Sequence, residues 1–187
     1  MKNNHTWVIC AYGESEFLEA CILSLQAQTL PSKIICYSST PLDSIKQLCQ
    51  KYGIPFYTKE GGGIGKDWNN ALSFVETSYA TIAHQDDYYE PTYLEAVMQK
   101  IEQSKDILIA YTDYFEEKNG VKIPANTNLK IKTLMLKTLN LMPSSRFWRN
   151  RVLAFGNPIS CPAVTYNLET LRDFRFDEEM RVSLDWY

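Results

Sequence analysis

Apolar side chains recur along the first two-thirds of the chain in two alternating patterns. Short continuous apolar runs are typical of strands that are covered on both faces. Between them, apolar residues return every three or four positions, as on the buried face of a helix. The runs predict strands at residues 7–11, 34–37, 56–58, 79–83 and 107–111. The helical spacing predicts helices around residues 17–25, 45–52, 68–75 and 94–101.

Strands that alternate with helices are joined by right-handed crossovers and form a mostly parallel sheet. We therefore expect a Rossmann-like α/β fold, with a central sheet flanked by helices and ligands at the carboxyl ends of the strands. Beyond residue 115 the alternation weakens: Asn119-Gly120 indicates a turn, residues 129–142 a helix and residues 163–166 a strand. We interpret all 187 residues as one domain.

The net charge of −3 conceals an uneven distribution of charge. Residues 118–168 contain eight of the 19 Lys and Arg residues and no Asp or Glu, so the other 11 stand against all 22 acidic residues. This asymmetry predicts a surface that meets anions. We do not expect a nucleic-acid partner, because the overall charge is negative and the basic segment is rich in apolar residues.

The cysteines and the apolar runs indicate a cytoplasmic protein. The five cysteines form no C-x-x-C pair, and most of them fall in apolar-patterned segments, as reduced core thiols do. No apolar run approaches the ~20 residues of a membrane span. Residues 1–5 lead into a strand-like segment and not into a signal sequence.

Two adjacent carboxylates, Asp86 and Asp87, follow the predicted strand 79–83 in the stretch His84-Gln85-Asp86-Asp87. A solvated turn before Pro91 is one interpretation. The other is a cation site, since the carboxyl end of an interior strand is where ligands bind. Side chains alternate along an extended backbone, so both carboxylates reach one spot only through a turn. Oxygen ligands suit Mg²⁺ or Mn²⁺ shared with substrate phosphates.

A glycine-rich stretch, Gly61 to Lys66, precedes the third predicted helix. It is not a P-loop, because Glu60 and Asp67 occupy positions that a P-loop gives to Gly and to Ser or Thr. Two interpretations stay open. The stretch is either a flexible loop, or a loop whose glycines let backbone approach a ligand while Lys66 and the helix N-terminus favour phosphate.

Three stretches together resemble the family-2 glycosyltransferases of the GT-A fold. They are the strand at residues 7–11, Gly-Lys-Asp-Trp-Asn-Asn-Ala-Leu at 65–72 and His-Gln-Asp-Asp-x-x-x-Pro at 84–91. The resemblance implies one GT-A domain over residues 1–187, with a nucleotide-sugar-binding half at 6–115 and an acceptor-side half at 116–187. We expect the second half to be incomplete, because Tyr187 ends the chain inside a helical pattern.

This resemblance implies a metal-dependent, hexosyltransferase-like enzyme that moves a sugar from a nucleotide-diphosphate donor to a glycan or lipid-linked acceptor, in the synthesis of cell-surface polysaccharide or glycoconjugate. Asp86 would hold Mn²⁺ or Mg²⁺, and His84 replaces the first acid of the family's metal-binding DXD motif. The residues expected to bind substrate are Ala11, Tyr12, Glu14, Ser38, Ser39, Gly65, Lys66, Asn69 and Asp87. Ser38 and Ser39 stand where the family usually has acids, so the nucleotide is not identified.

An inverting transfer needs a carboxylate that takes the proton of the acceptor hydroxyl. The resemblance assigns this role to Asp185, with Glu178 and Glu179 as alternatives. A residue placed near a helix N-terminus for its charge would explain Asp185 equally well.

Two other functions stay open on the sequence. One is a sugar-phosphate nucleotidyltransferase, although residues 12–16 are acidic where such enzymes carry a basic, glycine-rich loop. The other is a non-catalytic sugar-nucleotide-binding domain of the same fold, which His84 and the missing acids favour.

The basic segment also has two interpretations. Residues 129–142 predict a helix with one apolar stripe, and an aromatic and basic stretch follows it at residues 146–151. A helix packed into the core with solvated lysines is one interpretation. The other is peripheral contact of residues 118–168 with anionic lipid at the inner face of the cell membrane. The members of the predicted stripe are Ile131, Leu134, Met135, Thr138 and Met142.

Overall fold

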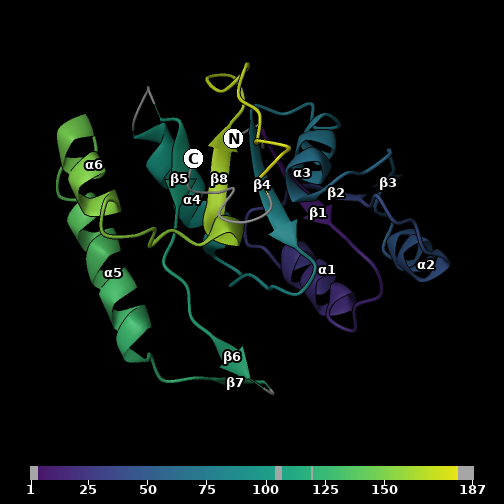
Figure 1. Cartoon of the computed structure of the whole chain (residues 1–187). Coiled ribbons are helices and arrows are strands. Elements are labelled where there is room, and N and C mark those ends of the chain that lie inside the picture. Colours follow the sequence, from purple (N-terminus) through teal and green to yellow (C-terminus); the bar gives the residue numbers. More distant parts are fainter. Residues whose placement is uncertain (1–3, 104–106, 119, 181–187) are drawn as a thin grey trace. The chain divides into compact units, whose positions relative to one another are not determined.

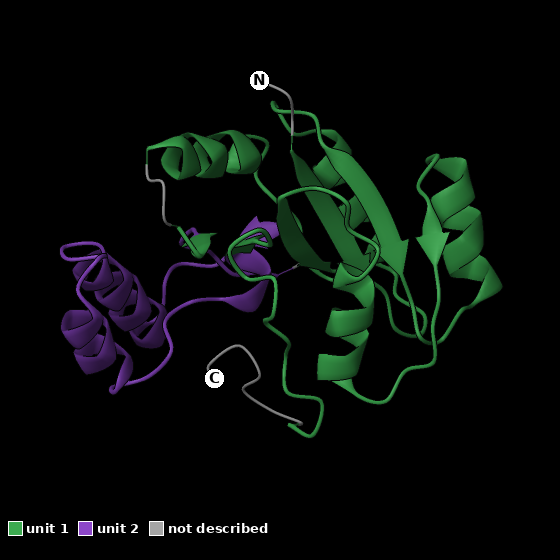
Figure 2. Ribbon diagram, turned by 90° about the horizontal axis from the view of Figure 1, so that it is seen from above, with its two compact units in different colours: residues 1–110, 164–187 green, residues 111–163 purple. Residues whose placement is uncertain are grey.

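The computed structural model describes residues 4–103, 107–118 and 120–180 (Figure 1). Contacts divide the chain into two compact units, one of residues 1–110 with 164–187 and one of residues 111–163 (Figure 2). The described residues after 163 therefore group with the first unit. The interpretation of the chain as one domain with functional halves at 6–115 and 116–187 stays a prediction.

The first unit is built on a six-stranded sheet in the order β3-β2-β1-β4-β8-β5. β1 pairs in parallel with β2 and β4, and β2 pairs in parallel with β3, whereas β8 runs antiparallel to β4. The expected α/β fold with a mostly parallel sheet is confirmed. The strands are β1 (His5–Cys10), β2 (Lys33–Tyr37), β3 (Phe56–Tyr57), β4 (Tyr79–His84), β5 (Ile109–Tyr111) and β8 (Val164–Asn167).

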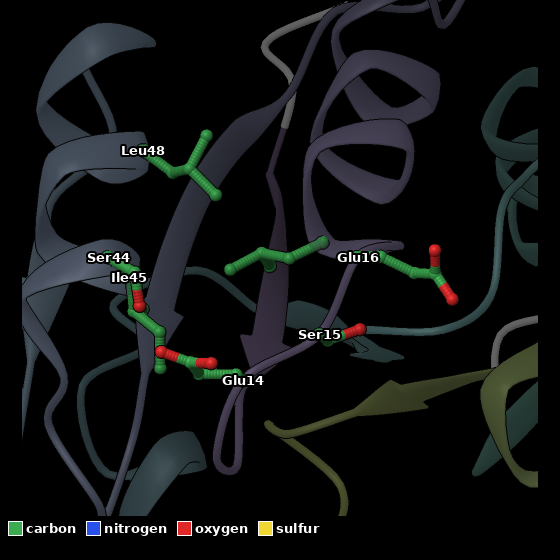
Figure 3. Close-up of a pocket in the computed structure, with 7 residues that line it drawn as sticks. Glu14, Ser15, Glu16, Ser44, Ile45 and Leu48 are labelled. Atoms are coloured by element: carbon green, nitrogen blue, oxygen red, sulfur yellow. The ribbon is translucent and has the colours of Figure 1, made fainter.

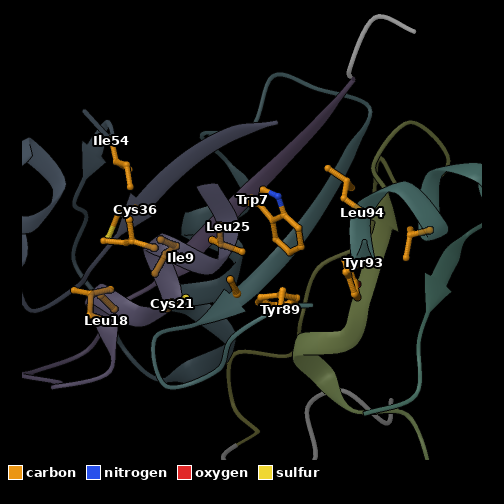
Figure 4. Packing of buried hydrophobic residues seen from close by; sticks show 14 of the residues in the cluster. Trp7, Ile9, Leu18, Cys21, Leu25, Cys36, Ile54, Tyr89, Tyr93 and Leu94 are labelled. Atoms are coloured by element: carbon orange, nitrogen blue, oxygen red, sulfur yellow. The ribbon is translucent and has the colours of Figure 1, made fainter. Parts of the chain in front are cut away.

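Helices cover both faces of this sheet, because successive side chains of a strand point to opposite sides. Trp7 and Ile9 of β1 belong to a large core cluster with residues of three helices, α1 (Leu18–Gln26), α2 (Asp43–Lys51) and α4 (Tyr93–Glu102) (Figure 4). Val8, between them, belongs to a second cluster with Ala71 of α3 (Ile64–Leu72). The sheet therefore has a packed core on each side.

The third helix begins four residues before the apolar spacing that predicted it. The spacing starts at Trp68, but α3 starts at Ile64. Gly63 precedes it with a φ of 121°, which a side chain would disfavour. The glycine-rich stretch therefore ends inside the first turn of a helix, where Gly65 is buried.

One buried polar group, the imidazole of His5, is fully paired. Its Nδ1 lies 2.9 Å from Ser32 Oγ and its Nε2 lies 2.9 Å from Thr81 Oγ1, and the residue has no exposed surface. Burial lowers the pKa of His5 to about 3, because the interior disfavours the charged ring. The folded protein therefore keeps this ring neutral.

All five cysteines are free thiols, and four of them are buried. Burial raises the pKa of Cys21 to about 12, which keeps this thiol protonated. The burial of Cys21, Cys36 and Cys49 agrees with the expected core thiols, whereas Cys10 is half-buried.

The second unit holds a short hairpin and two helices. β6 (Glu117–Lys118) and β7 (Val121–Lys122) pair antiparallel around Gly120, whose φ is 76°. α5 (Thr127–Leu139) was predicted, but α6 (Arg146–Leu153) was not. Ser145 starts α6 by accepting a hydrogen bond from the Trp148 N–H, which is a standard cap.

The predicted apolar stripe of α5 is wrong. The buried residues of this helix are Leu129, Leu136 and Leu139, whereas Ile131 and Leu134 are 52% and 61% exposed. Apolar residues occur on both sides of α5, so spacing alone did not decide which side is buried. In the part of the chain that the structure describes, no helix is long and apolar enough to cross a bilayer.

Candidate functional site

The carboxyl ends of β1, β2 and β4 meet at one edge of the sheet. The Ala11 N–H, just after β1, donates to the Tyr37 carbonyl at 2.8 Å and holds the loop after β1 beside β2. Ala11 itself is buried, so its contribution at this edge is its backbone. His84 ends β4 on the other side of β1, opposite Cys10. Residues far apart in sequence are thus brought to one place, as the sequence pattern predicts.

A tight turn gathers three side chains directly after β4. The Asp87 N–H donates to the His84 carbonyl at 3.2 Å, which folds Asp87 back toward the strand end. One ligand atom each of His84, Asp86 and Asp87 lies within 4.8 Å of the others. This is the turn that the sequence argument required for both carboxylates to reach one spot. The three side chains are hereafter called the metal cluster.

The imidazole in the metal cluster is held in a fixed plane. It stacks on Trp68 of α3, with ring centroids 5.6 Å apart and planes 25° apart. Its Nδ1 lies 3.6 Å from Asp87 Oδ2, and its Nε2 is buried without a hydrogen-bond partner among the described residues. Burial raises the pKa of Asp87, while the nearby imidazole lowers it. A bound cation would offset this cost of a partly buried charge.

Gln85, between the residues of the metal cluster, holds the loop after β1. Its side-chain Oε1 accepts the Tyr12 N–H at 3.1 Å, and its Nε2 donates to the Tyr12 carbonyl at 2.8 Å. The Tyr12 ring is 68% exposed beside this clamp. The sequence analysis did not single out Gln85, which directly follows the last residue of β4.

The loop after β2 is joined to α3 by a carboxylate that the sequence did not single out. Ser39 Oγ donates to Asp67 Oδ2 at 2.8 Å, and Gly61 packs so closely that an added Cβ would lie 2.6 Å from Ser39 Cβ. Ser38 is buried, and its hydroxyl accepts the Thr40 N–H at 3.1 Å. Asp67 therefore places an acid beside the β2 loop, where the resemblance had found none.

Asn69 ties α3 to the end of the described chain. Its amide donates to the Phe176 carbonyl at 2.9 Å and accepts the Phe176 N–H at 2.9 Å. The same amide nitrogen lies 3.0 Å from Glu178 Oε1. The polar atoms of Asn69 are thus engaged within the protein, and its role toward substrate stays a prediction.

Lys66 and Glu14 have separate surroundings in the structure. Lys66 is half-buried in the first turn of α3, where an added Cβ on Gly62 would meet its side chain. Glu14 is exposed and lines a pocket of about 470 Å³ between the loop before α1 and the helix α2 (Figure 3). Figure 3 shows Glu14 directed toward Ser44 and Ile45 of α2.

The expected catalytic base, Asp185, lies outside the described residues. Of the alternatives, Glu178 is brought to α3 by Asn69, as described above. Glu179 is exposed, and its backbone N–H donates to Asp177 Oδ1 at 2.8 Å. Among the described candidates, Glu178 is thus the acid in contact with the helix that carries Lys66.

Comparison with solved structures shows a common fold. The S. aureus protein TarS (residues 1–349) matches with a TM-score of 0.71 and 20% identity, covering 98% of this chain and 53% of that one. Glucosyl-3-phosphoglycerate synthase from Mycobacterium tuberculosis, solved with Mn²⁺, UDP and its product, matches with a TM-score of 0.64 and 14% identity, covering 98% and 64%. The expected GT-A fold is confirmed.

Comparison of sequences identifies the family. The glycosyltransferase GlyA of Streptococcus pneumoniae serotype 4 is 24% identical over 123 residues, which is 62% of this chain and 18% of GlyA. The chain therefore spans about half of the TarS fragment of residues 1–349, about a third of the longer TarS structure and under a fifth of GlyA. The model of the family described as "Glycosyl transferase family 2" matches residues 6–162. On this match, the chain belongs to glycosyl transferase family 2.

Proposed function

We propose that this chain binds a nucleotide-diphosphate sugar and transfers its sugar to an acceptor hydroxyl, and that the donor is a UDP-sugar. The observation that carries the proposal is the metal cluster at the carboxyl edge of a parallel sheet, in a member of a glycosyltransferase family. Structures of TarS with UDP and with UDP-GlcNAc support the choice of donor.

The residues at this edge suit a divalent cation and a diphosphate. Two carboxylates and an imidazole converge within reach of one ion, which fits Mn²⁺ or Mg²⁺, with Asp86 as the exposed ligand and Asp87 beside it. Such an ion, when bound, neutralises charge on the leaving diphosphate. The N-terminus of α3 and Lys66 would attract the same phosphates.

The nucleoside would lie over the loops after β1 and β2. The exposed ring of Tyr12 offers a flat apolar surface to a base, and Gln85 fixes its position. The Ser39–Asp67 pair offers hydroxyl and carboxylate groups to a ribose or a base. These groups would supply the polar contacts to the nucleoside.

The transfer itself would invert the anomeric carbon. In the proposed step the acceptor oxygen bonds to C1 as the bond from C1 to the diphosphate breaks, and Asp185 takes the hydroxyl proton. Glu178 is the alternative base. We propose a glycan or a lipid-linked acceptor, in the synthesis of a cell-surface polysaccharide or glycoconjugate.

Peripheral contact with anionic membrane at the inner face of the cell membrane is a further part of the proposal. Residues 118–163 carry basic side chains and no acids. Phe147 and Phe155 in this segment are 69% and 89% exposed. A surface that is both basic and apolar suits anionic lipid.

Calorimetric titration of the chain with UDP, GDP and CDP, each with and without Mn²⁺, tests the proposal. We expect UDP to bind most tightly and only with the metal. At about 100 times its dissociation constant it would add about 2.7 kcal/mol to the stability. Tighter Mn²⁺-dependent binding of GDP or CDP would refute the choice of donor, and no nucleotide binding would refute the donor site.

Turnover assays separate the transferase from the two other functions. Release of UDP from a UDP-sugar, with transfer to an added acceptor, supports the proposal. Exchange of pyrophosphate into a nucleotide sugar would point to a nucleotidyltransferase, which family membership disfavours. Binding of UDP without any turnover would point to a non-catalytic binding domain.

A further inference from the structure

His84 occupies the position in the metal cluster where the family motif has an acid, and the fold holds its ring in place. Its backbone ends β4 opposite Cys10 of β1, and its carbonyl accepts the Cys21 thiol at 3.4 Å. Trp68 stacks on the ring, as described above. The strand pairing of the His84 backbone and the stacking of its ring on Trp68 orient the imidazole without a ligand.

Only one nitrogen of this ring is open to a cation. Nε2 is buried among protein atoms and has no hydrogen-bond partner among the described residues. Nδ1 instead faces the carboxylate of Asp87, which the turn after β4 folds back toward it. An ion that reaches the imidazole must therefore approach Nδ1, on the side where the Asp87 carboxylate lies.

The distance between Nδ1 and Asp87 Oδ2 is compatible with two ligands of one ion and too long for a hydrogen bond. At 3.6 Å it exceeds the ~3.2 Å limit of an N–H···O bond. Two ligands that each lie about 2.2 Å from a metal are about 3.1 Å apart at a right angle and about 3.6 Å apart at about 110°. A cation between the two atoms would satisfy both lone pairs.

We propose that His84 Nδ1 is a direct ligand of the divalent cation, so that this site prefers Mn²⁺ or Co²⁺ to Mg²⁺. The preference follows from the ligands, because imidazole binds transition metals well whereas Mg²⁺ favours oxygen ligands only. The inference rests on the proposed function for the identity of the donor. The role of His84 as a ligand and the metal preference rest on the geometry of the metal cluster.

Electron-spin-echo spectroscopy of bound Mn²⁺ tests the inference directly, because a coordinated imidazole nitrogen modulates the echo. The chain has only two histidines, and the imidazole ring of His5 is buried and within hydrogen-bond distance of a hydroxyl at both nitrogens. A nitrogen signal in tag-free protein would therefore come from His84. Spectra are recorded with Mn²⁺ alone and with Mn²⁺ and UDP.

His84→Asp and His84→Asn are the matched variants. We expect nitrogen modulation in the wild type and none in either variant. In His84→Asp, which restores an all-oxygen site, the ratio of the Mg²⁺ to the Mn²⁺ dissociation constant should fall at least about tenfold. The wild-type spectrum does not depend on the variants, and circular dichroism checks that each variant folds.

The possible outcomes separate this inference from the proposed function. Bound Mn²⁺ without nitrogen modulation, or no bound Mn²⁺ at all, would overturn the role of His84. UDP binding in that case would leave the donor site standing. Nitrogen modulation with Mn²⁺ alone, in protein that does not bind UDP, would support the role of His84 and refute the choice of donor.

Discussion

The two compact units differ in where their apolar side chains lie. In the unit of residues 1–110 and 164–187, both faces of the sheet are packed, and residues such as Trp7 have no exposed surface. In the unit of residues 111–163, α6 has no buried residue, and large apolar side chains such as Phe147 are exposed. The first unit buries its apolar residues in cores on both faces of its sheet, whereas many large apolar side chains of the second unit are exposed.

Charge follows the same division. The metal cluster places two carboxylates together in the first unit, whereas residues 111–163 of the second carry eight basic residues and three acids, Asp113, Glu116 and Glu117. Under the proposed function, the first unit would bind a cation and its phosphates, and the net positive second unit would meet anions. The four predictions below test this contrast, from the largest expected effect to the smallest.

Loss of one aromatic side chain should destabilise the two units very differently. Trp7→Ala removes a ring packed on Tyr89 and Tyr93 and should lower the free energy of unfolding by about 3–5 kcal/mol. Phe147→Ala removes an exposed ring and should change it by less than about 0.5 kcal/mol. Urea unfolding followed by circular dichroism measures both. Equal losses would show that Phe147 is buried in the folded protein.

Loss of one carboxylate should affect nucleotide binding only at the metal cluster. Asp86→Asn should weaken Mn²⁺-dependent UDP binding about 100-fold, or about 2.7 kcal/mol, because it removes a charged ligand. Asp87→Asn should weaken it less. Glu76→Gln, at the opposite end of β4, is the control, since Glu76 pairs only with an exposed lysine. Calorimetry that gives one affinity for wild type and Asp86→Asn would remove Asp86 from the site.

Acid should destabilise the first unit through His5. The folded pKa of about 3 lies below the ordinary value of 6.5, so the unfolded chain binds the additional proton between these two values. Stability should therefore fall as the pH drops through this window, by about 2 kcal/mol between pH 7 and pH 5. Urea unfolding at both values measures the change. His5→Gln should be less stable at pH 7 but lose most of this pH dependence; if it keeps the full slope, other groups are responsible.

Basic residues of the second unit should matter only at a membrane. In co-sedimentation with anionic vesicles, Lys130→Gln and Lys137→Gln should each weaken binding by about 1 kcal/mol, which is about fivefold. Lys33→Gln, an exposed lysine in the first unit, should have no effect. Neutral vesicles should bind none of these proteins. Wild-type protein that stays in the supernatant with anionic vesicles at low salt would contradict the membrane proposal.

The accuracy of the sequence-based predictions also differs between the units. Strands such as β1 were predicted because a short, continuous apolar run is typical of an interior strand that is buried on both faces. The α5 stripe was wrong because apolar residues occur around that helix. Helix α6 was missed because its sequence, rich in arginine and aromatics, has no buried face whose spacing could reveal it.

At the site, the sequence identified the clustered carboxylates but not the residues that hold the neighbouring loops by hydrogen bonds. Asp86 and Asp87 were found because a carboxylate pair after a buried strand is unusual. Gln85 and Asp67 were missed, since each acts through contacts with residues more than 25 positions away in the sequence. Each lies inside a stretch that the sequence analysis had singled out, but the partners that give it a role at the site are visible only in the fold.

Hydrogen bonds between Gln85 and Tyr12 couple the loop after β1 to the turn after β4. Two hydrogen bonds fasten the loop after β1 to the turn that carries the metal cluster, so neither can shift without the other. Under the proposed function, a nucleoside bound on Tyr12 would therefore have its diphosphate placed at a set distance from the cation. On that proposal Gln85 would select for length: a nucleotide with a different spacing between base and phosphates would contact one end of the site and miss the other.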